Sequence, residues 1–189
     1  MSLSINKTDE ELVKLSLEDN KFYGELISRY QNKFSQYIGR RAKVSREDIE
    51  DLLQEIFIKI YLNLRDFDTN LKFSSWGYRI AHNELISWYR KKSIRPQINF
   101  EDYEEENMLN FISDNTDLVN AAHNKDFKKH FEEELEKMDQ KYREIITLRM
   151  VDEKDYEEIS DILQIPVGTV STQIYRAKKE LQKNLQKYI

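Results

Sequence analysis

The stretch from Asp66 to Lys92 combines aromatic, amide and cationic side chains at helical spacing. With about 100° per residue, one side of the predicted helix carries an indole, an amide, a hydroxyl and two guanidinium groups, from Trp76, Asn83, Ser87, Arg79 and Arg90. An indole can stack on an unpaired base, an amide can hydrogen-bond a base edge, and guanidinium groups can hold phosphates. The stretch therefore predicts a nucleic-acid surface.

The elements that position this surface are predicted to be helices. Only four Gly and two Pro occur among 189 residues, whereas sheets joined by tight turns usually use more of both. The length suits two small domains, each with a modest core. We therefore expect an all-α chain made of two small helical domains.

The composition argues against several other kinds of chemistry. Cysteine is absent, and His82, His123 and His130 are too scattered to suggest a metal cage. We find no Gly-rich phosphate loop and no nucleophile–base pair, so we expect neither an enzyme nor a bound cofactor, metal or small-molecule substrate. The sequence has no apolar run of membrane-spanning length and no apolar leader, so we expect a cytoplasmic protein without membrane insertion.

The net charge of -5 hides a strong separation of charge along the chain. Residues 99–119 hold seven carboxylates and no Lys or Arg, while residues 72–95 hold six cations against Glu84 alone. Residues 164–189 hold five cations against Glu180. Two basic segments that flank an acidic one are compatible with nucleic-acid binding in spite of the acidic total.

Helix starts can be located from capping signals. Thr8 to Glu11 has capping-box spacing, Ser45 offers an N-cap, and Ser74 or Ser75 can cap the helix of the nucleic-acid surface. Between the first two of these signals, apolar residues at helical spacing predict a helix from about Asn20 to Arg41. The basic cluster at its end is interpreted as a solvated helix end in preference to a phosphate site.

The helix that follows Ser45 is predicted to show apolar residues on two sides. One stripe suits a core, and it comprises Ile49, Leu52, Leu53, Ile56, Phe57, Ile60 and Leu64. On the other side Ile58 and Leu62 stand among Asp51, Gln54 and Glu55. This second side is either a protein interface or a face that a neighbouring helix covers. The positions of the residues around the helix do not decide between these two alternatives.

Residues 96–116 show no sustained period and are interpreted as an acidic linker between domains over 1–95 and 117–189. Such a linker can be merely solvated, can keep the two basic domains off each other's surfaces, or can mimic nucleic acid in a basic channel. Four apolar residues form a candidate docking patch within it: Met108, Leu109, Phe111 and Ile112.

The C-terminal part predicts a helix-turn-helix motif. A short helix leads into the turn Gln164 to Pro166, and a longer basic helix begins at Val167. Val167 and Val170 start the stripe that is predicted to be buried. The opposite side carries Gly168, Thr169, Ser171, Thr172, Tyr175, Arg176 and Lys179, a pattern that suits base edges near the helix start and phosphates beyond. A merely solvated basic helix is the alternative.

Over nearly its whole length the sequence resembles the bacterial RNA polymerase sigma factors of the extracytoplasmic-function (ECF) group. Three motifs in order carry the resemblance: Asp51 to Glu55, Phe73 to Asn83, and the helix-turn-helix from Tyr156 to Lys178. The resemblance implies a dissociable promoter-specificity subunit. Its partners would be core RNA polymerase, through the β′ clamp and the β subunit, promoter DNA and an anti-sigma factor.

The resemblance also implies roles for individual residues. Core polymerase would be bound by Asp51, Gln54, Glu55, Ile58 and Leu62. The minus-ten element would be recognised and melted by Lys72, Phe73, Trp76, Arg79, Asn83, Ser87 and Arg90. The minus-thirty-five element would be read by Gly168, Thr169, Ser171, Thr172, Tyr175, Arg176 and Lys179.

The chain departs from the family pattern in and after the turn. Gln164 stands where a small residue or glycine is frequent, and Ser171 and Gln173 stand near positions that are commonly basic. Fewer cations there should weaken phosphate attraction. Two alternatives remain: a helix-turn-helix regulator that acts without polymerase, and a sigma-like protein that titrates an anti-sigma partner.

Overall fold

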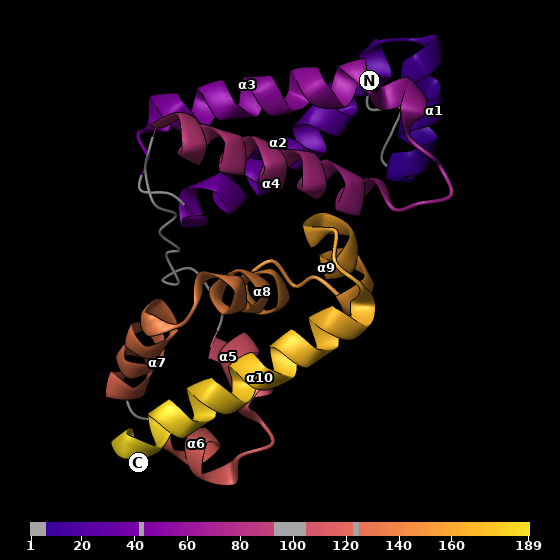
Figure 1. Cartoon of the computed structure of the whole chain (residues 1–189). Coiled ribbons are helices and arrows are strands. Elements are labelled where there is room, and N and C mark those ends of the chain that lie inside the picture. The colour runs from indigo at the N-terminus through magenta and orange to yellow at the C-terminus, as the bar shows by residue number, and fades with distance from the viewer. Residues whose placement is uncertain (1–6, 42–43, 93–104, 123–124) are drawn as a thin grey trace. The chain divides into compact units, whose positions relative to one another are not determined.

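The computed structural model describes residues 7–41, 44–92, 105–122 and 125–189, and in these ranges every regular element is a helix. The contacts divide the chain into two compact units, and the main division falls between residues 92 and 105. The first is built on α1 to α4 and the second on the helices from α5 onward (Figure 1). No helix of the described ranges is long and apolar enough to cross a membrane.

Four helices and one short 3-10 turn form the first unit. They are α1 (Asp9–Glu18), α2 (Lys21–Arg41), α3 (Arg46–Leu62), η1 (Leu64–Asp66) and α4 (Phe73–Lys92). The predicted caps of α1 and α3 are confirmed, because Thr8 and Glu11 form a capping box and the Ser45 side chain accepts from the Asp48 amide. α4 differs: it begins at Phe73, ahead of both serines, and the Phe73 amide donates to Glu10 of α1 at 2.8 Å.

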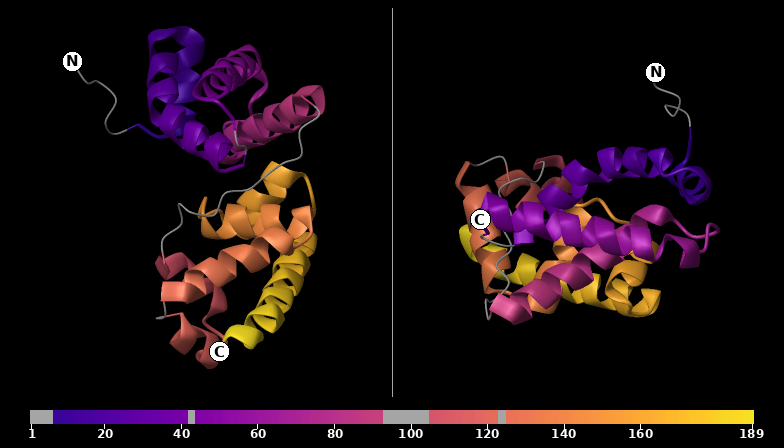
Figure 2. Two further views of the ribbon diagram at one scale, coloured as in Figure 1. Left: turned by 90° about the vertical axis from the view of Figure 1, so that its left-hand side faces the viewer. Right: turned by 90° about the horizontal axis from the view of Figure 1, so that it is seen from above.

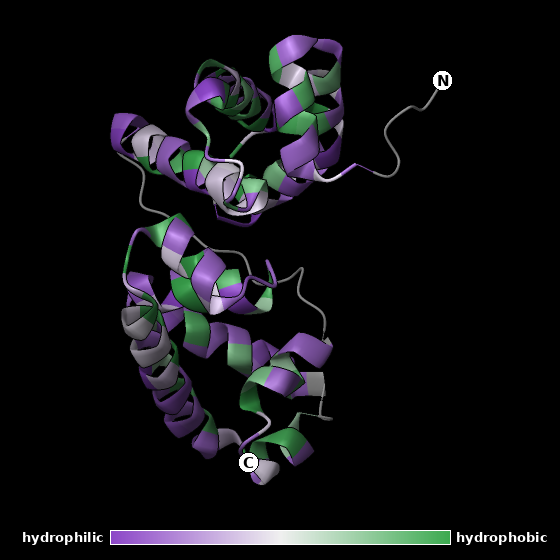
Figure 3. Cartoon of the chain, turned by 90° about the vertical axis from the view of Figure 1, so that its right-hand side faces the viewer, coloured by the Kyte–Doolittle hydropathy of each residue, from purple (hydrophilic) through white to green (hydrophobic). Residues whose placement is uncertain are grey.

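The core of the first unit is rich in aromatic rings from α2 and α4. Phe34 and Tyr78 meet edge to face with centroids 5.2 Å apart, and Tyr30 meets Phe73 in the same way at 5.2 Å. Figure 3 shows hydrophobic and hydrophilic residues alternating along the helices of this unit. The predicted stripe of α3 contributes Leu52, Leu53, Ile56 and Ile60, all of them buried.

The end of α2 is not the solvated basic tip that the sequence suggested. Arg41 is 1% exposed, and its guanidinium carbon lies 3.7 Å from the centroid of the Tyr37 ring. The Tyr89 hydroxyl of α4 donates to the Arg41 carbonyl. Cation–π stacking over Tyr37 compensates part of the cost of burying the charge.

The second unit contains the remaining helices. They are α5 (Glu105–Ile112), α6 (Thr116–Ala121), α7 (Lys125–Lys137), α8 (Gln140–Met150), α9 (Tyr156–Leu163), α10 (Val167–Leu185) and the 3-10 turn η2 (Gln186–Tyr188). α10 packs against α7 and α8, and Figure 2 shows it as one long helix along the unit. Its predicted stripe is buried at Val170, Ile174, Ala177, Leu181 and Leu185, but Val167 is 43% exposed because it precedes the first packed turn.

Part of the expected linker is a packed helix. Within α5, Met108, Phe111 and Ile112 are buried, and the helix contacts α8 and α10. The Asp114 carboxylate accepts from Gln182 at 2.6 Å and lies 3.1 Å from Lys178, both on α10. The apolar patch predicted here therefore docks on its own unit, while residues 93–104 lie outside the described ranges.

Candidate functional site

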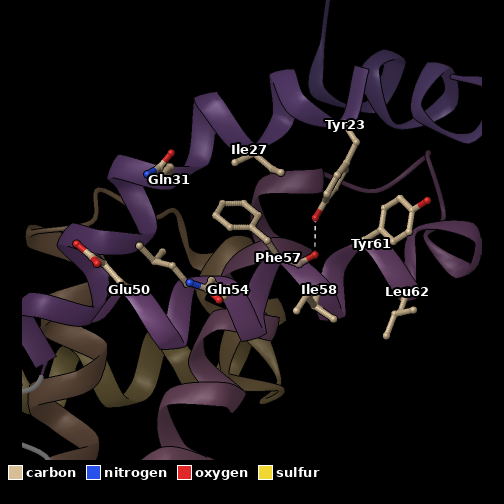
Figure 4. A pocket seen from close by; sticks show the side chains of 10 residues that line it. Tyr23, Ile27, Gln31, Glu50, Gln54, Phe57, Ile58, Tyr61 and Leu62 are labelled. Carbon is tan, nitrogen blue, oxygen red and sulfur yellow. Dashed lines mark hydrogen bonds between the residues drawn. The ribbon is translucent and has the colours of Figure 1, made fainter. Parts of the chain in front are cut away.

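An open apolar groove runs between α2 and α3 (Figure 4). Its volume is about 600 Å³, and it is lined by Tyr23, Ile27, Gln31, Glu50, Leu53, Gln54, Phe57, Ile58, Tyr61 and Leu62. Ile58 is 58% exposed and Leu62 is 70% exposed. Among the described residues no neighbouring helix covers the second apolar side of α3, so of the two alternatives the sequence left open, the covered face is wrong.

Packing between the two helices holds this groove in shape. The Tyr23 hydroxyl donates to the Phe57 carbonyl at 2.5 Å, and the Tyr23 and Tyr61 rings lie 5.1 Å apart (Figure 4). Burial raises the pKa of Tyr23, so the phenol keeps the proton that it donates. Asp51 and Glu55 are exposed on α3 outside the groove lining, whereas Gln54 belongs to the lining.

A smaller polar hollow lies where α3 and η1 meet α4. It has a volume of about 300 Å³ and is lined by Lys59, Asn63, Asp66, Trp76, Arg79, Ile80, Asn83 and Glu84. The structure thus brings together Trp76, Arg79 and Asn83 from the predicted nucleic-acid surface. We call this feature the α4 hollow.

The Trp76 ring forms part of a packed aromatic cluster. It lies 5.0 Å from Phe67 and 5.8 Å from Phe73, measured between ring centroids. Trp76 is half-buried as a result, and Phe73 is 1% exposed. Burial of Phe73 makes it a support for Trp76 and not a surface on which a base can stack.

The other predicted residues of this surface do not line the α4 hollow. Lys72, the residue before α4, and Arg90, in the last turn of α4, are exposed. Ser87 is half-buried, and its hydroxyl donates to the Asn83 carbonyl at 2.8 Å. These groups extend the polar face of α4 in both directions from the hollow.

Lys59 and Glu84 are lining residues that the sequence reasoning missed. Lys59 Nζ lies 2.5 Å from Glu84 Oε1, and the pair joins α3 to α4. The one available signal was that Glu84 is the single acid among the six cations of residues 72–95. That signal gave no partner, because 25 residues separate the two in sequence.

In the second unit the helix-turn-helix motif has the predicted turn. Gln164 ends α9 in the left-handed conformation, with φ 55° and ψ 45°, and its amide donates to the Ser160 carbonyl. The Ser160 hydroxyl donates to the Ile165 carbonyl at 2.6 Å, and Pro166 is the N-cap of α10. These bonds fix the direction in which α10 leaves the turn.

The exposed face of α10 carries the predicted minus-thirty-five residues. Gly168, Ser171, Thr172, Tyr175, Arg176 and Lys179 are exposed, and Thr169 is half-buried. Figure 3 shows this outer face as mainly neutral to hydrophilic. Thr172 donates to the Gly168 carbonyl at 2.8 Å, while Lys179 lies 5.8 Å from the centroid of the Tyr175 ring.

No group of three metal-ligating side chains occurs in the part of the chain that the structure describes. The fold and its surfaces define a helical, two-unit protein with a helix-turn-helix motif and an open apolar groove. Comparisons with known proteins define the class further. Residues 26–94 match the family Sigma-70 region 2, and residues 129–181 match the family Sigma-70, region 4.

Full-length relatives give the family. The chain is 33% identical over 188 residues to the ECF RNA polymerase sigma factor SigW of Bacillus subtilis, covering 98% of each chain. It is 32% identical over 194 residues to the ECF RNA polymerase sigma-E factor of Escherichia coli K12, covering 99% of each. The chain belongs to the ECF sigma factors, and it directs RNA polymerase to promoters in transcription initiation.

Two solved structures share the fold. CnrH in complex with the cytosolic domain of CnrY matches with a TM-score of 0.64 at 22% identity, covering 95% of this chain and 98% of that one. The sigma factor RpoE of Bartonella quintana, in complex with the anti-sigma factor NepR, matches with a TM-score of 0.54 at 20% identity, covering 89% and 98%.

Proposed function

We propose that three surfaces divide the work of this sigma factor: the α2–α3 groove docks core polymerase, the α4 hollow captures an unstacked base, and α10 reads upstream duplex DNA. The observation that carries the proposal is the uncovered second apolar side of α3, with Ile58 and Leu62 exposed. A regulator that binds duplex DNA alone has no need for that surface.

For polymerase docking, the α3 face offers an apolar centre with a polar rim. Ile58 and Leu62 supply the apolar contact, while Asp51, Gln54 and Glu55 surround it with carboxylates and an amide. Specific interfaces commonly combine such a centre with such a rim. We assign this face to the β′ clamp of core polymerase and leave the β subunit to the second unit.

For promoter opening, the α4 hollow offers a receptor for a base from the non-template strand. Unstacking a base costs a few kcal/mol, and stacking on an aromatic group returns about 1–3 kcal/mol. Trp76 and Asn83 in one hollow therefore offset much of that cost without ATP. Lys72, exposed just before α4, and Arg90, exposed in its last turn, are assigned to the DNA backbone.

For the minus-thirty-five element, the front of α10 enters a major groove. Ser171, Thr172 and Tyr175 present short polar and phenolic groups in the first half of the helix, and Arg176 and Lys179 follow them along the chain. Hydroxyl groups can bond to base edges, and cations bind phosphates on any sequence. α10 thus has the order of groups that base reading followed by phosphate binding requires.

We also propose that the chain has an anti-sigma partner and works in the cytoplasm, where core polymerase and promoters are found. Both solved neighbours were captured with a second protein, CnrY in one case and the anti-sigma factor NepR in the other. An anti-sigma protein that covered the α2–α3 groove would compete directly with polymerase.

Run-off transcription with core polymerase tests the proposal. Adding the wild-type chain is expected to give promoter-dependent transcripts, and Ile58→Glu is expected to abolish them because it places a charge in the apolar groove. Leu17→Glu is the matched control, since Leu17 is 45% exposed on α1 and lies outside the groove lining. If adding the wild-type chain gave no promoter-dependent transcripts, the proposed function would be refuted. If Ile58→Glu were fully active, the assignment of the groove as the docking surface would be refuted.

A further inference from the structure

The α4 hollow contains a buried charge that base stacking does not require. Glu84 has a side chain only 8% exposed, and it lines the hollow together with Lys59, whose side chain is 51% exposed. The two heads lie 2.5 Å apart. A carboxylate is costly to bury in a cavity unless its acceptor sites are used.

Glu84 has acceptor capacity left after it binds Lys59. An ionised carboxylate offers about four lone-pair sites on two oxygens. Among the described residues, Lys59 is the one donor to this side chain, and it bonds to Oε1. Oε2 can therefore accept from a ligand in the hollow, and a bond to a charged acceptor is roughly twice as strong as a neutral one.

Lys59 has donor capacity left in the same place. Its ammonium carries three N–H groups, and one of them is directed at Glu84. The pair thus presents an acceptor and a donor side by side. The complementary ligand has a donor next to an acceptor, and about 300 Å³ is at the lower limit of ligand pockets, which suits one planar ring system.

Cytosine, adenine and guanine each present such an edge, because each carries an exocyclic amine, N4, N6 or N2, beside a ring nitrogen that accepts a hydrogen bond. Thymine has no exocyclic amine, and its carbonyl oxygens would face the Glu84 carboxylate. Two acceptors in contact without a proton between them are repelled and lose their water.

We propose that the Lys59–Glu84 pair determines base specificity in the α4 hollow and selects a base with an exocyclic amine over thymine. The inference rests on the proposed function, in which this hollow receives an unstacked base of the minus-ten element. Asn83 and Trp76 hold the base in place, and the ion pair reads its edge.

A selection experiment tests the proposal with the complete holoenzyme. Promoters with a randomised minus-ten element are transcribed, and the transcripts are sequenced. The wild type is expected to exclude thymine at one position in favour of bases with an exocyclic amine, and the double variant Lys59→Met, Glu84→Met is expected to lower that discrimination about tenfold. Lys92→Met is the matched control, because Lys92 pairs with Asp48 between the same two helices at 3.5 Å but does not line the hollow.

A second measurement removes the base amine instead of the side chains. The selected base is replaced by its analogue without the exocyclic amine, which is 2-pyrimidinone for cytosine, purine for adenine and hypoxanthine for guanine. Open-complex formation is then measured with wild type and Glu84→Gln. The two changes are expected to be non-additive, since they break the same bond. Additive losses, or an unchanged base preference in the active double variant, would overturn the specificity role while leaving the proposed function intact. A wild type without promoter-directed transcripts would instead refute the proposed function.

Discussion

Gly77 of α4 lies directly against the ring of Phe34 from α2. A Cβ atom at position 77 would stand 3.1 Å from Phe34 Cζ. The ring is fully buried and in contact with the rings of Tyr30, Phe57 and Tyr78, so it has no room to move aside. The close approach of α2 and α4, and with it the position of the nucleic-acid face, depends on a glycine here.

Gly77→Ala is therefore expected to destabilise the protein by about 1–3 kcal/mol through overpacking. The usual gain from replacing a helical glycine is smaller, about 0.5–1 kcal/mol. Urea unfolding followed by circular dichroism measures the difference. Gly24→Ala is the control, because no atom lies within 4 Å of a Cβ at that exposed position of α2. If Gly77→Ala and Gly24→Ala stabilised the protein equally, the contact with Phe34 would not cause the expected overpacking.

Gln164 adopts the left-handed conformation, which costs a residue with a side chain about 1–2 kcal/mol. Gln164→Gly is expected to raise the free energy of unfolding by about 1 kcal/mol, because glycine adopts this conformation freely. Gln164→Val should lower it, since a β-branched residue resists positive φ. Chemical denaturation of the three proteins gives the order, and a valine variant as stable as wild type would contradict the role of the turn.

A buried carboxylate ties the C-terminus to α7. Glu134 accepts from Lys137 at 2.7 Å, from Lys187 at 2.9 Å and from the Tyr188 hydroxyl at 3.2 Å. Burial alone would raise the pKa of Glu134, but these donors outweigh it and hold the pKa at about 2, below its ordinary 4.5. The group therefore contributes stability above pH 4.5, and the contribution is lost as the pH falls toward 2.

Glu134→Gln is expected to lower the free energy of unfolding at pH 7 by roughly 1–3 kcal/mol, because hydrogen bonds to an ionised acceptor are lost. The gap between variant and wild type should narrow as the pH falls from 4.5 toward 2. Unfolding curves at several pH values measure it. Glu136→Gln, exposed on the same helix, is the control. A gap independent of pH would mean that Glu134 acts through packing alone.

Local signals in the sequence were sufficient for much of this fold. Caps at Thr8 and Ser45 and the apolar stripes of α3 and α10 could be predicted, because they depend on residues within a few turns of one another. α5 was not predicted, since seven carboxylates around it obscured the spacing of Met108, Phe111 and Ile112.

The residues that make up the candidate site were harder to predict from the sequence than the fold. Trp76, Arg79 and Asn83 lie on one helix, and their common face follows from spacing. Lys59 enters from α3, and its pairing with Glu84 depends on how two helices pack. Burial of Phe73 and Arg41 is likewise a property of packing, which the type of a residue does not reveal.

Asn83 lies exposed on α4 and lines the hollow, so its amide can reach a base that has left the stack. Asn83→Ala is expected to reduce transcription from a duplex promoter by roughly tenfold, and to reduce it far less from a pre-melted bubble, where unstacking has already been achieved. Asn32→Ala, on an exposed position of α2, is the control. Equal losses on both templates would count against a role in melting.

Arg176 lies exposed on α10, in the phosphate-binding part of the predicted recognition face. Arg176→Ala is expected to weaken binding of the holoenzyme to upstream duplex DNA on all sequences, because a phosphate contact carries no base preference. Each lost phosphate contact should also reduce the slope of log affinity against log salt by about 1. Binding measured across a salt series gives both quantities.

The control for this change is Lys129→Ala, which removes an exposed cation from α7 outside the recognition face. It leaves the net charge equal to that of Arg176→Ala, so a general electrostatic effect would appear in both variants alike. A contact-specific effect appears in Arg176→Ala alone, since counterion release depends on the phosphates that are neutralised and not on the total charge. An unchanged slope in Arg176→Ala would place this residue off the DNA and leave the phosphates to Lys179 and its neighbours.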